Sequence, residues 1–238
     1  MMENQETIVT TNNANPGIRS VDVNRGVEWL VGGFKMVFKT PGVWLLVGLA
    51  FLIGSWILGK FWLGSALSTA FGIVFTGVMM RACQSLESGQ DFATGLKETF
   101  SSAPLWILGL IGAALSFAIV LVVGLLGVGS VTVGAVSPGA FGSMLGLSFL
   151  LLFALGFVLY SALWLAPALV VLQRVNPVDA IRLSLMASLR NILAYIVFGL
   201  LAMIACILGA LPLGLGLLVV FPALMCASYL AYKDMFGA

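Results

Sequence analysis

The sequence predicts an all-α fold: a polytopic membrane helix bundle with six transmembrane helices and amphipathic elbow helices that lie in the membrane interface. Composition is the first reason. Hydrophobic residues make up 61% of the 238-residue chain and charged residues 8%, whereas a soluble domain has roughly 25% charged residues. The second reason is that several apolar runs reach the length of roughly 18 residues that suffices to cross a bilayer.

The first 23 residues are expected to form a disordered cytoplasmic tail, because they are polar and show no hydrophobic periodicity. They also lack the charged start, apolar core and small-residue cleavage site of a secretory signal. The membrane domain is expected to cover residues 24–238. Its first elbow helix is residues 24–39, where apolar residues recur at helical spacing on one side while Glu28, Lys35 and Lys39 share the other.

Six apolar segments, separated by polar steps, are predicted to span the membrane. They are residues 43–58, 61–83, 104–128, 144–172, 192–211 and 213–232. A second elbow helix is expected at residues 91–100. Residues 129–143, which are uncharged and rich in Gly, Ser and Val, are predicted to form the longest exposed loop, on the outer face.

The distribution of basic residues predicts the orientation. With six spans and the N-terminus in the cytoplasm, every Lys and Arg except Lys60 falls on the inner side. Basic residues are enriched in the cytoplasmic segments of membrane proteins. Both termini are therefore predicted to be cytoplasmic.

The third elbow helix, residues 177–190, has the most complete helix signals in the chain. Asn176 is a good N-cap, Pro177 suits the first helical position, and Asp179 stands at the third position, as in a capping box. Apolar residues share one face of this helix and charged residues another. The apolar set is Val178, Ile181, Leu185 and Leu189, and the charged set is Asp179, Arg182 and Arg190.

We expect this third elbow to be the working surface, because it concentrates cytoplasmic charges that an anionic headgroup or a partner protein could bind. The candidate binding residues are Arg174, Asn176, Asp179, Arg182, Arg190 and Asn191. The alternative is that these arginines only fix the topology, with their side chains reaching toward the interface.

Small residues recur at every fourth position of the second span, at Gly64, Ser68, Gly72 and Thr76. Helices in a bilayer associate by close packing, which small side chains permit. These four residues are therefore predicted to be a helix-packing face. The alternative is that the helix lines a polar path, to which Ser65, Thr69 and Ser116 would also contribute.

Catalysis has little support in the sequence. The chain has no histidine, the commonest general base and metal ligand. Cys83, Cys206 and Cys226 lie in or beside apolar runs and are expected to be packing residues rather than reactive thiolates. No acidic or basic residue lies in the apolar part of a predicted span, which argues against a proton-coupled transporter. We expect no enzyme activity, no cofactor, no metal site and no nucleic-acid partner.

Three stretches resemble an uncharacterised family of six-span proteobacterial inner-membrane proteins: residues 33–46, 164–201 and 211–236. The middle stretch is also distantly similar to YciC-type proteins and to glycerophosphodiesterase membrane-domain proteins. The shared features are Pro167-Ala168, a serine at Ser184 or Ser188, and Asn191. The resemblance implies the six-span fold and the bacterial inner membrane, and it implies no activity.

These observations predict a non-catalytic integral protein of the bacterial inner membrane. Its cytoplasmic elbows would bind membrane lipids, another membrane protein or a second copy of the chain. The alternative is a small transporter or channel for an uncharged or amphipathic solute, and a binding role for residues 129–143 on the outer face comes third. A closed bundle would favour the first function, and a continuous cavity along the hydroxyl-bearing residues would favour transport.

Overall fold

The computed structural model describes residues 17–60, 64–89, 92–136 and 138–237. All regular secondary structure in these ranges is α-helical, which confirms the predicted all-α class. Six of the helical segments described are long and apolar enough to cross a membrane, so the chain is a multi-pass membrane protein. They are Pro41–Leu58, Ala66–Ser88, Ala103–Leu126, Gly146–Leu172, Ile192–Ala210 and Leu217–Phe236.

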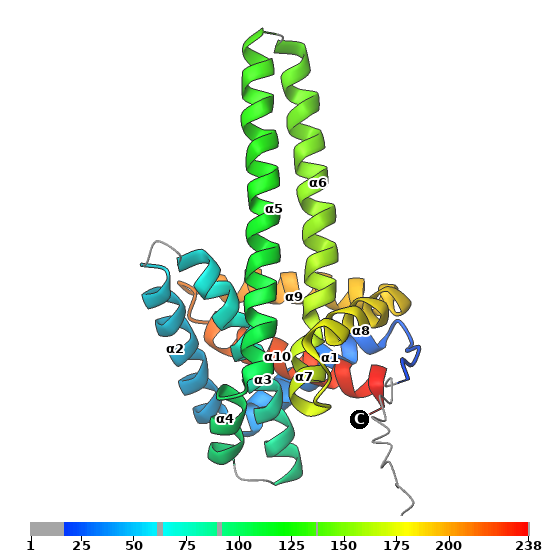
Figure 1. Ribbon diagram of the computed structural model, residues 1–238. Coiled ribbons are helices and arrows are strands. Elements are labelled where there is room, and N and C mark those ends of the chain that lie inside the picture. Colours follow the sequence, from blue (N-terminus) through cyan, green and yellow to red (C-terminus); the bar gives the residue numbers. More distant parts are fainter. Residues whose placement is uncertain (1–16, 61–63, 90–91, 137, 238) are drawn as a thin grey trace, which may run out of the picture.

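In the described part of the chain, a short amphipathic helix precedes each pair of long helices (Figure 1). The first group is α1 (Arg25–Lys39), α2 (Pro41–Leu58) and α3 (Gly64–Ser88). The second is α4 (Phe92–Phe100), α5 (Ala103–Val136) and α6 (Pro138–Trp164), which α7 (Ala166–Leu172) extends. The third is α8 (Pro177–Arg190), α9 (Ile192–Ala210) and α10 (Leu217–Phe236). All three predicted elbow segments are therefore helical.

The hairpin of α5 and α6 projects from the rest of the protein (Figure 1). The predicted loop over residues 129–143 was wrong, because α5 continues to Val136 and α6 begins at Pro138. Glycine weakens a helix by only about 1 kcal/mol relative to alanine, a preference that tertiary context overrides, and here α5 packs along α6. With 34 residues, α5 is about 51 Å long, longer than the roughly 30 Å hydrocarbon core.

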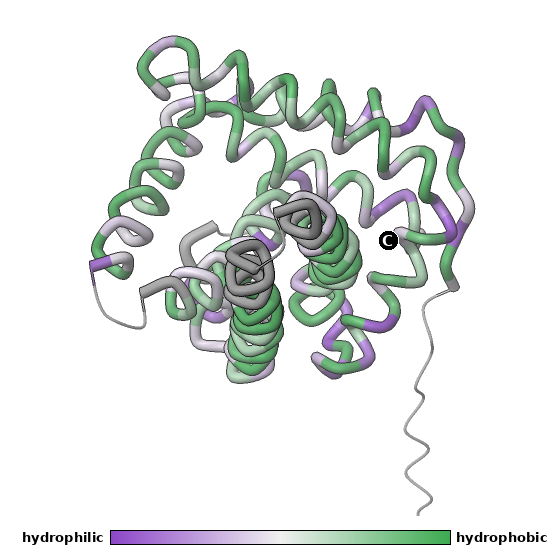
Figure 2. The backbone as a smooth tube through the Cα atoms, turned by 90° about the horizontal axis from the view of Figure 1, so that it is seen from above, coloured by the Kyte–Doolittle hydropathy of each residue, from purple (hydrophilic) through white to green (hydrophobic). Residues whose placement is uncertain are grey.

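Helices α1, α9 and α10 lie across the direction of this hairpin, as the view along α5 and α6 shows (Figure 2). Glycines let α1 approach its neighbours closely. A Cβ atom on Gly33 would collide with the backbone oxygen of Ala223 in α10, and one on Gly26 would lie 2.6 Å from the backbone oxygen of Ala194. The buried side of α1 therefore carries these glycines and Trp29, and Phe38 is left exposed.

The end of α10 is fixed to the start of α1 by polar contacts. Asp234 accepts hydrogen bonds from Arg25 Nε at 2.9 Å and from Trp29 Nε1 at 2.6 Å. The hydrogen bond to Asp234 raises the pKa of the Arg25 guanidinium above its ordinary value. The arginine therefore stays charged over the accessible pH range.

The segment before α1 is attached to the protein rather than free. Residues 1–16 of the predicted disordered tail lie outside the described residues, but residues 17–23 do not. Arg19 N donates to Met235 O at 2.7 Å, and Val21 N donates to Asn191 Oδ1 at 2.8 Å. The prediction of disorder was therefore wrong for residues 17–23, because backbone hydrogen bonds hold them against the C-terminal helices.

The break between α6 and α7 follows from Pro167, which lies in the first turn of α7 and cannot continue a helix from α6. Such a break leaves backbone groups without helical partners. Ser184 of α8 compensates, because its Oγ accepts from Leu165 N at 3.0 Å and donates to Ser161 O at 2.9 Å. The helix α8 is thereby fixed against the end of α6.

Candidate ligand cavity

A cavity of about 710 Å³ lies among α3, α5, α6, α9 and α10. Its volume is in the range of roughly 300–1,000 Å³ that is usual for ligand pockets. Among the described residues that line it, none is charged, and most are apolar, as Leu159, Met203 and Leu224 are. Tyr160 and Met203 are also 60% and 54% exposed, so the cavity opens on the side of the bundle.

Helix α9 runs across the direction of the α5–α6 hairpin (Figure 2), and residues of α5, α6 and α9 line the cavity. Near its start α9 contacts α6 through aromatic rings: Trp164 lies 4.8 Å from Tyr195 and 5.5 Å from Phe198, between ring centroids. Beyond these rings α9 turns small residues toward the cavity, among them Gly199 and Ala202. Crossing helices touch over a short length, and small side chains leave the space beside the crossing unfilled.

The residues of α3 that were predicted to form a helix-packing face lie in part along the cavity. A Cβ atom on Gly72 would meet no heavy atom within 4 Å, and both Gly72 and Thr76 line the cavity. Ser68 is half-buried, and the side chain at position 64 lies outside the described residues. The packing prediction was therefore wrong for Gly72 and Thr76, which border open space rather than a neighbouring helix.

The close contact between α3 and α5 is made by a glycine that the sequence analysis missed. A Cβ atom on Gly109 of α5 would lie 2.9 Å from the backbone oxygen of Ala70. Gly109 and Ala113 are small residues four positions apart, as the residues of the second span are, so the spacing does not tell the packing glycine from the others. Small residues that pack and small residues that border a cavity have the same pattern in the sequence.

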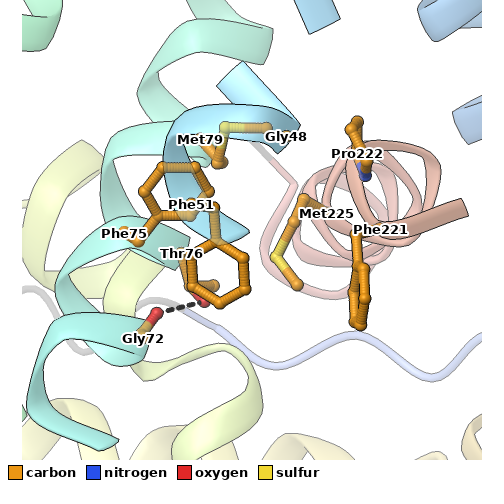
Figure 3. Close-up of a pocket in the computed structure, with 9 residues that line it drawn as sticks. All are labelled: Gly48, Phe51, Gly72, Phe75, Thr76, Met79, Phe221, Pro222 and Met225. Carbon is orange, nitrogen blue, oxygen red and sulfur yellow. Dashed lines mark hydrogen bonds between the residues drawn. The ribbon is translucent and has the colours of Figure 1, made fainter. Parts of the chain in front are cut away.

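A smaller pocket of about 80 Å³ adjoins the cavity and lies among α2, α3 and α10. It shares Gly72, Thr76, Phe221 and Met225 with the main cavity. Figure 3 shows Phe51 and Phe75 on one side of this pocket, opposite Phe221 and Met225 of α10. Methionine side chains adapt to irregular apolar shapes, so this wall can adjust to an occupant.

The hydroxyl groups around the cavity do not form a polar path. Thr76 Oγ1 donates to Gly72 O and Ser116 Oγ donates to Gly112 O, both at 2.8 Å. Such bonds to the carbonyl four residues earlier satisfy the hydroxyl within its own helix. Of the residues proposed for a polar path, Thr69, Thr76 and Ser116 line the cavity, and the side chain of Ser65 lies outside the described residues.

Two hydroxyl groups stand at the α6 and α10 walls. Ser228 Oγ accepts from Trp164 Nε1 and donates to Leu224 O, each at 2.9 Å, so its capacity is used within the protein. The Tyr160 hydroxyl has no hydrogen-bond partner among the described residues. It is therefore the lining group best placed to hydrogen-bond a molecule in the cavity.

The third elbow helix, α8, has three different sides. Its small residues, such as Ala180, Ser184 and Ala187, are buried against the protein. The apolar Val178 and Leu189 are exposed. The predicted binding residues Asp179, Arg182 and Arg190 are exposed as well. This arrangement is typical of a helix in the membrane interface, and these three charged residues are separate from the cavity.

The other three predicted binding residues have different positions. Asn176 caps α8 as predicted, because its Oδ1 accepts from Val178 N at 3.0 Å. Asn176 and Arg174 line a second pocket, at the connection between α7 and α8.

Asn191 is 4% exposed, and its Nδ2 donates to Arg19 O and Ala187 O, each at 3.0 Å. Placing it in an exposed binding surface was wrong, because its amide holds the segment before α1.

The three cysteines differ in their surroundings. Cys83 and Cys226 are fully buried with their Sγ atoms 2.9 Å apart, and both are free thiols. Cys206 of α9 is half-buried and lines the cavity. It is therefore the one cysteine of the three that a molecule in the cavity would contact.

Comparison with protein-family models, curated proteins and solved structures finds no match to this chain. The resemblance to six-span inner-membrane proteins stays a prediction. The cavity combines a large volume, an uncharged lining among the described residues and an opening on the side of the bundle.

Proposed function

We propose that this protein is a non-catalytic membrane protein that holds the acyl chain of a lipid in the cavity beside α9. The volume of about 710 Å³ behind an uncharged, mostly apolar lining carries the proposal. The sequence predicted lipid binding at the elbow helices. The proposed binding site lies inside the bundle instead.

The physical case for a lipid chain starts from the cost of an empty apolar cavity. Atoms that line a void lose their dispersion contacts on one side. The exposed Tyr160 and Met203 place the opening of this cavity on the apolar surface of the bundle. Acyl chains surround that surface in a bilayer, and an entering chain would restore the lost contacts. The Tyr160 hydroxyl would hydrogen-bond an ester or hydroxyl group of the lipid.

A transporter for an amphipathic solute would use the same cavity, but the satisfied hydroxyls favour a resident chain. Movement of a polar solute requires groups that replace its hydration along the route. Here Thr76 and Ser116 donate to carbonyls of their own helices. The cavity therefore offers apolar contacts along its length.

We further propose that the protein lies in the bacterial inner membrane with both termini in the cytoplasm. Charged residues from distant parts of the chain meet at one end of the bundle, as in the ion pairs Arg25–Asp234 and Lys233–Glu87. Lys60 follows the end of α2, and its Nζ lies 4.8 Å from the ring centroid of Trp56. Basic residues are in excess at the end of the bundle that holds Arg25 and Lys233. This excess supports a cytoplasmic location for that end.

Cavity-filling variants test the lipid proposal. Gly72→Leu and Gly199→Leu each add a side chain where a Cβ meets no atom within 4 Å and where the residue borders the cavity. Gly124→Leu is the matched control, because Gly124 is equally open but does not border the cavity. Lipids that co-purify with each variant would be quantified by mass spectrometry.

We expect wild type and Gly124→Leu to retain the same tightly bound lipid and both cavity-filling variants to lose most of it. Equal retention in all four proteins would contradict the proposal. Loss in Gly124→Leu as well would show that the retained lipid covers the outside of the bundle.

A further inference from the structure

A second pocket, of about 430 Å³, lies where α3, α4 and the start of α5 meet the connection between α7 and α8. Two arginines line it, Arg81 of α3 and Arg174 of the connection, and Glu98 of α4 is the acidic residue in its lining. Ser102 and Asn176 add polar groups. We call it the arginine pocket.

The backbone of Arg174 is in an unusual conformation. Its φ of 55° lies in the left-handed region, which favours glycine and is uncommon for a residue with a side chain. Val175 N donates to Leu169 O at 3.1 Å, and Gln173 N donates to the same oxygen at 3.2 Å, as at a helix end that a left-handed residue closes. Glycine would fit this position with less strain, so the presence of arginine points to a use for its side chain.

Arg81 of α3 is the other arginine that lines the pocket. It is half-buried, and its Nη1 donates to Gln84 Oε1 at 2.6 Å, which holds the guanidinium and leaves its other N–H groups for a ligand. Among the described residues neither Arg81 nor Arg174 forms an ion pair. Two positive charges and the single negative charge of Glu98 leave the pocket lining with one excess positive charge.

The N-termini of two helices add partial positive charge to the arginine pocket. Ser102 and Pro104 stand at the start of α5, and Asn176 and Pro177 at the start of α8, and all four residues line the pocket. A helix N-terminus carries partial positive charge and favours anions. The Oδ1 atom of Asn176 accepts from Val178 N, which leaves its Nδ2 group as a donor.

We propose that the arginine pocket binds a phosphate group, either of an anionic lipid or of free phosphate. The guanidinium group matches phosphate geometry with paired hydrogen bonds, and a second arginine, from another element of the lining, adds charge. The exposed apolar side of α8, with Val178, places the pocket at the level of the membrane interface. This proposal is independent of whether a lipid chain occupies the cavity beside α9.

Arg174→Gly is the most informative variant. It removes the guanidinium and places glycine at a left-handed position, so the fold is retained or stabilised while the anion site is lost. Arg81→Gln removes the other guanidinium. The matched control is the pair Arg182→Gln and Arg190→Gln, because these arginines are exposed on α8 and do not line the pocket.

The full chain in neutral detergent would be titrated with dihexanoyl phosphatidylglycerol, dihexanoyl phosphatidylcholine, inorganic phosphate and chloride at constant ionic strength. Binding would be followed by native mass spectrometry and by the shift in melting temperature. We expect phosphatidylglycerol to bind wild type more tightly than phosphatidylcholine does. We expect Arg174→Gly and Arg81→Gln each to weaken that binding by roughly tenfold to a hundredfold, as the loss of a charge-assisted contact predicts.

The source of the phosphate follows from the other titrations. A response to inorganic phosphate identifies a site for the free anion, and a response to phosphatidylglycerol alone identifies a lipid headgroup site. In both cases the response must weaken by roughly tenfold or more in Arg174→Gly and persist in the Arg182→Gln and Arg190→Gln controls. Unchanged binding in Arg174→Gly, equal loss in the controls, or no response to any phosphate compound would overturn the proposal.

Discussion

Two pairs of neighbouring helices use small residues in opposite ways. Between α1 and α10, Gly33 brings two backbones into contact, and a Cβ atom would collide with Ala223. By contrast, Gly72 of α3 and Gly199 of α9 both line the cavity, and a Cβ atom on either would meet nothing within 4 Å. A small residue therefore permits close packing but does not cause it. The position of the opposite helix decides whether contact or a cavity results.

The largest expected effect on stability tests the close contact between α1 and α10. Gly33→Ala should lower the free energy of unfolding by about 2–3 kcal/mol, because the added methyl group meets backbone atoms that cannot move aside. The adjacent Gly32→Ala is the control, since its methyl group meets the end of the flexible Leu230 side chain. Both changes gain helix propensity. Denaturant unfolding in detergent, followed by tryptophan fluorescence, measures the difference, and equal effects would contradict the backbone contact.

A smaller effect is expected at the junction that attaches residues 17–23. Asn191→Ala should cost about 1–2 kcal/mol, because Val21 N and Arg19 O lose their partner. It should also speed limited proteolysis before α1. Asn191→Asp keeps the acceptor for Val21 N but sets a buried carboxylate against the carbonyl oxygens of Arg19 and Ala187, so it should cost at least as much as Asn191→Ala. Unchanged proteolysis in Asn191→Ala would show that this segment is held by other contacts.

The smallest expected effect on stability tests the cavity wall at Gly72. Gly72→Leu should change the free energy of unfolding by about 0.5 kcal/mol or less, because its side chain enters the cavity without displacing a helix. Gly124→Leu provides the reference for the same change on the outside of α5. A loss of stability as large as that of Gly33→Ala would restore the prediction that Gly72 is a packing residue.

The sequence was sufficient to predict features that depend on local chemistry. Apolar length predicted the six spans, amphipathic periodicity predicted the three elbow helices, and Asn176 caps α8 as its position indicated. The prediction of a loop at residues 129–143 was wrong, because glycine and serine do not end the helices there. Their low helix propensity is a weak preference, which the packing of α5 along α6 overrides.

The cavity could not be predicted because it depends on how distant helices cross. Nothing near Gly72 in the sequence indicates that α9 passes at a distance or that α1 and α10 touch at Gly33. The serine and asparagine that supported the family resemblance have structural uses here. Ser184 bridges the break between α6 and α7, and Asn191 holds residues 19 and 21.

Photo-crosslinking with a phospholipid that carries a diazirine near the end of its acyl chain tests most directly whether a chain enters the cavity. Trp164 and Phe198 line the cavity and are only 5% and 3% exposed. Leu105 and Leu169 are fully buried but do not line it. The proposed function predicts lipid adducts on Trp164 and Phe198, none on Leu105 and Leu169, and loss of the first two in Gly199→Leu. Adducts confined to exposed residues such as Phe149 and Leu150 would contradict it.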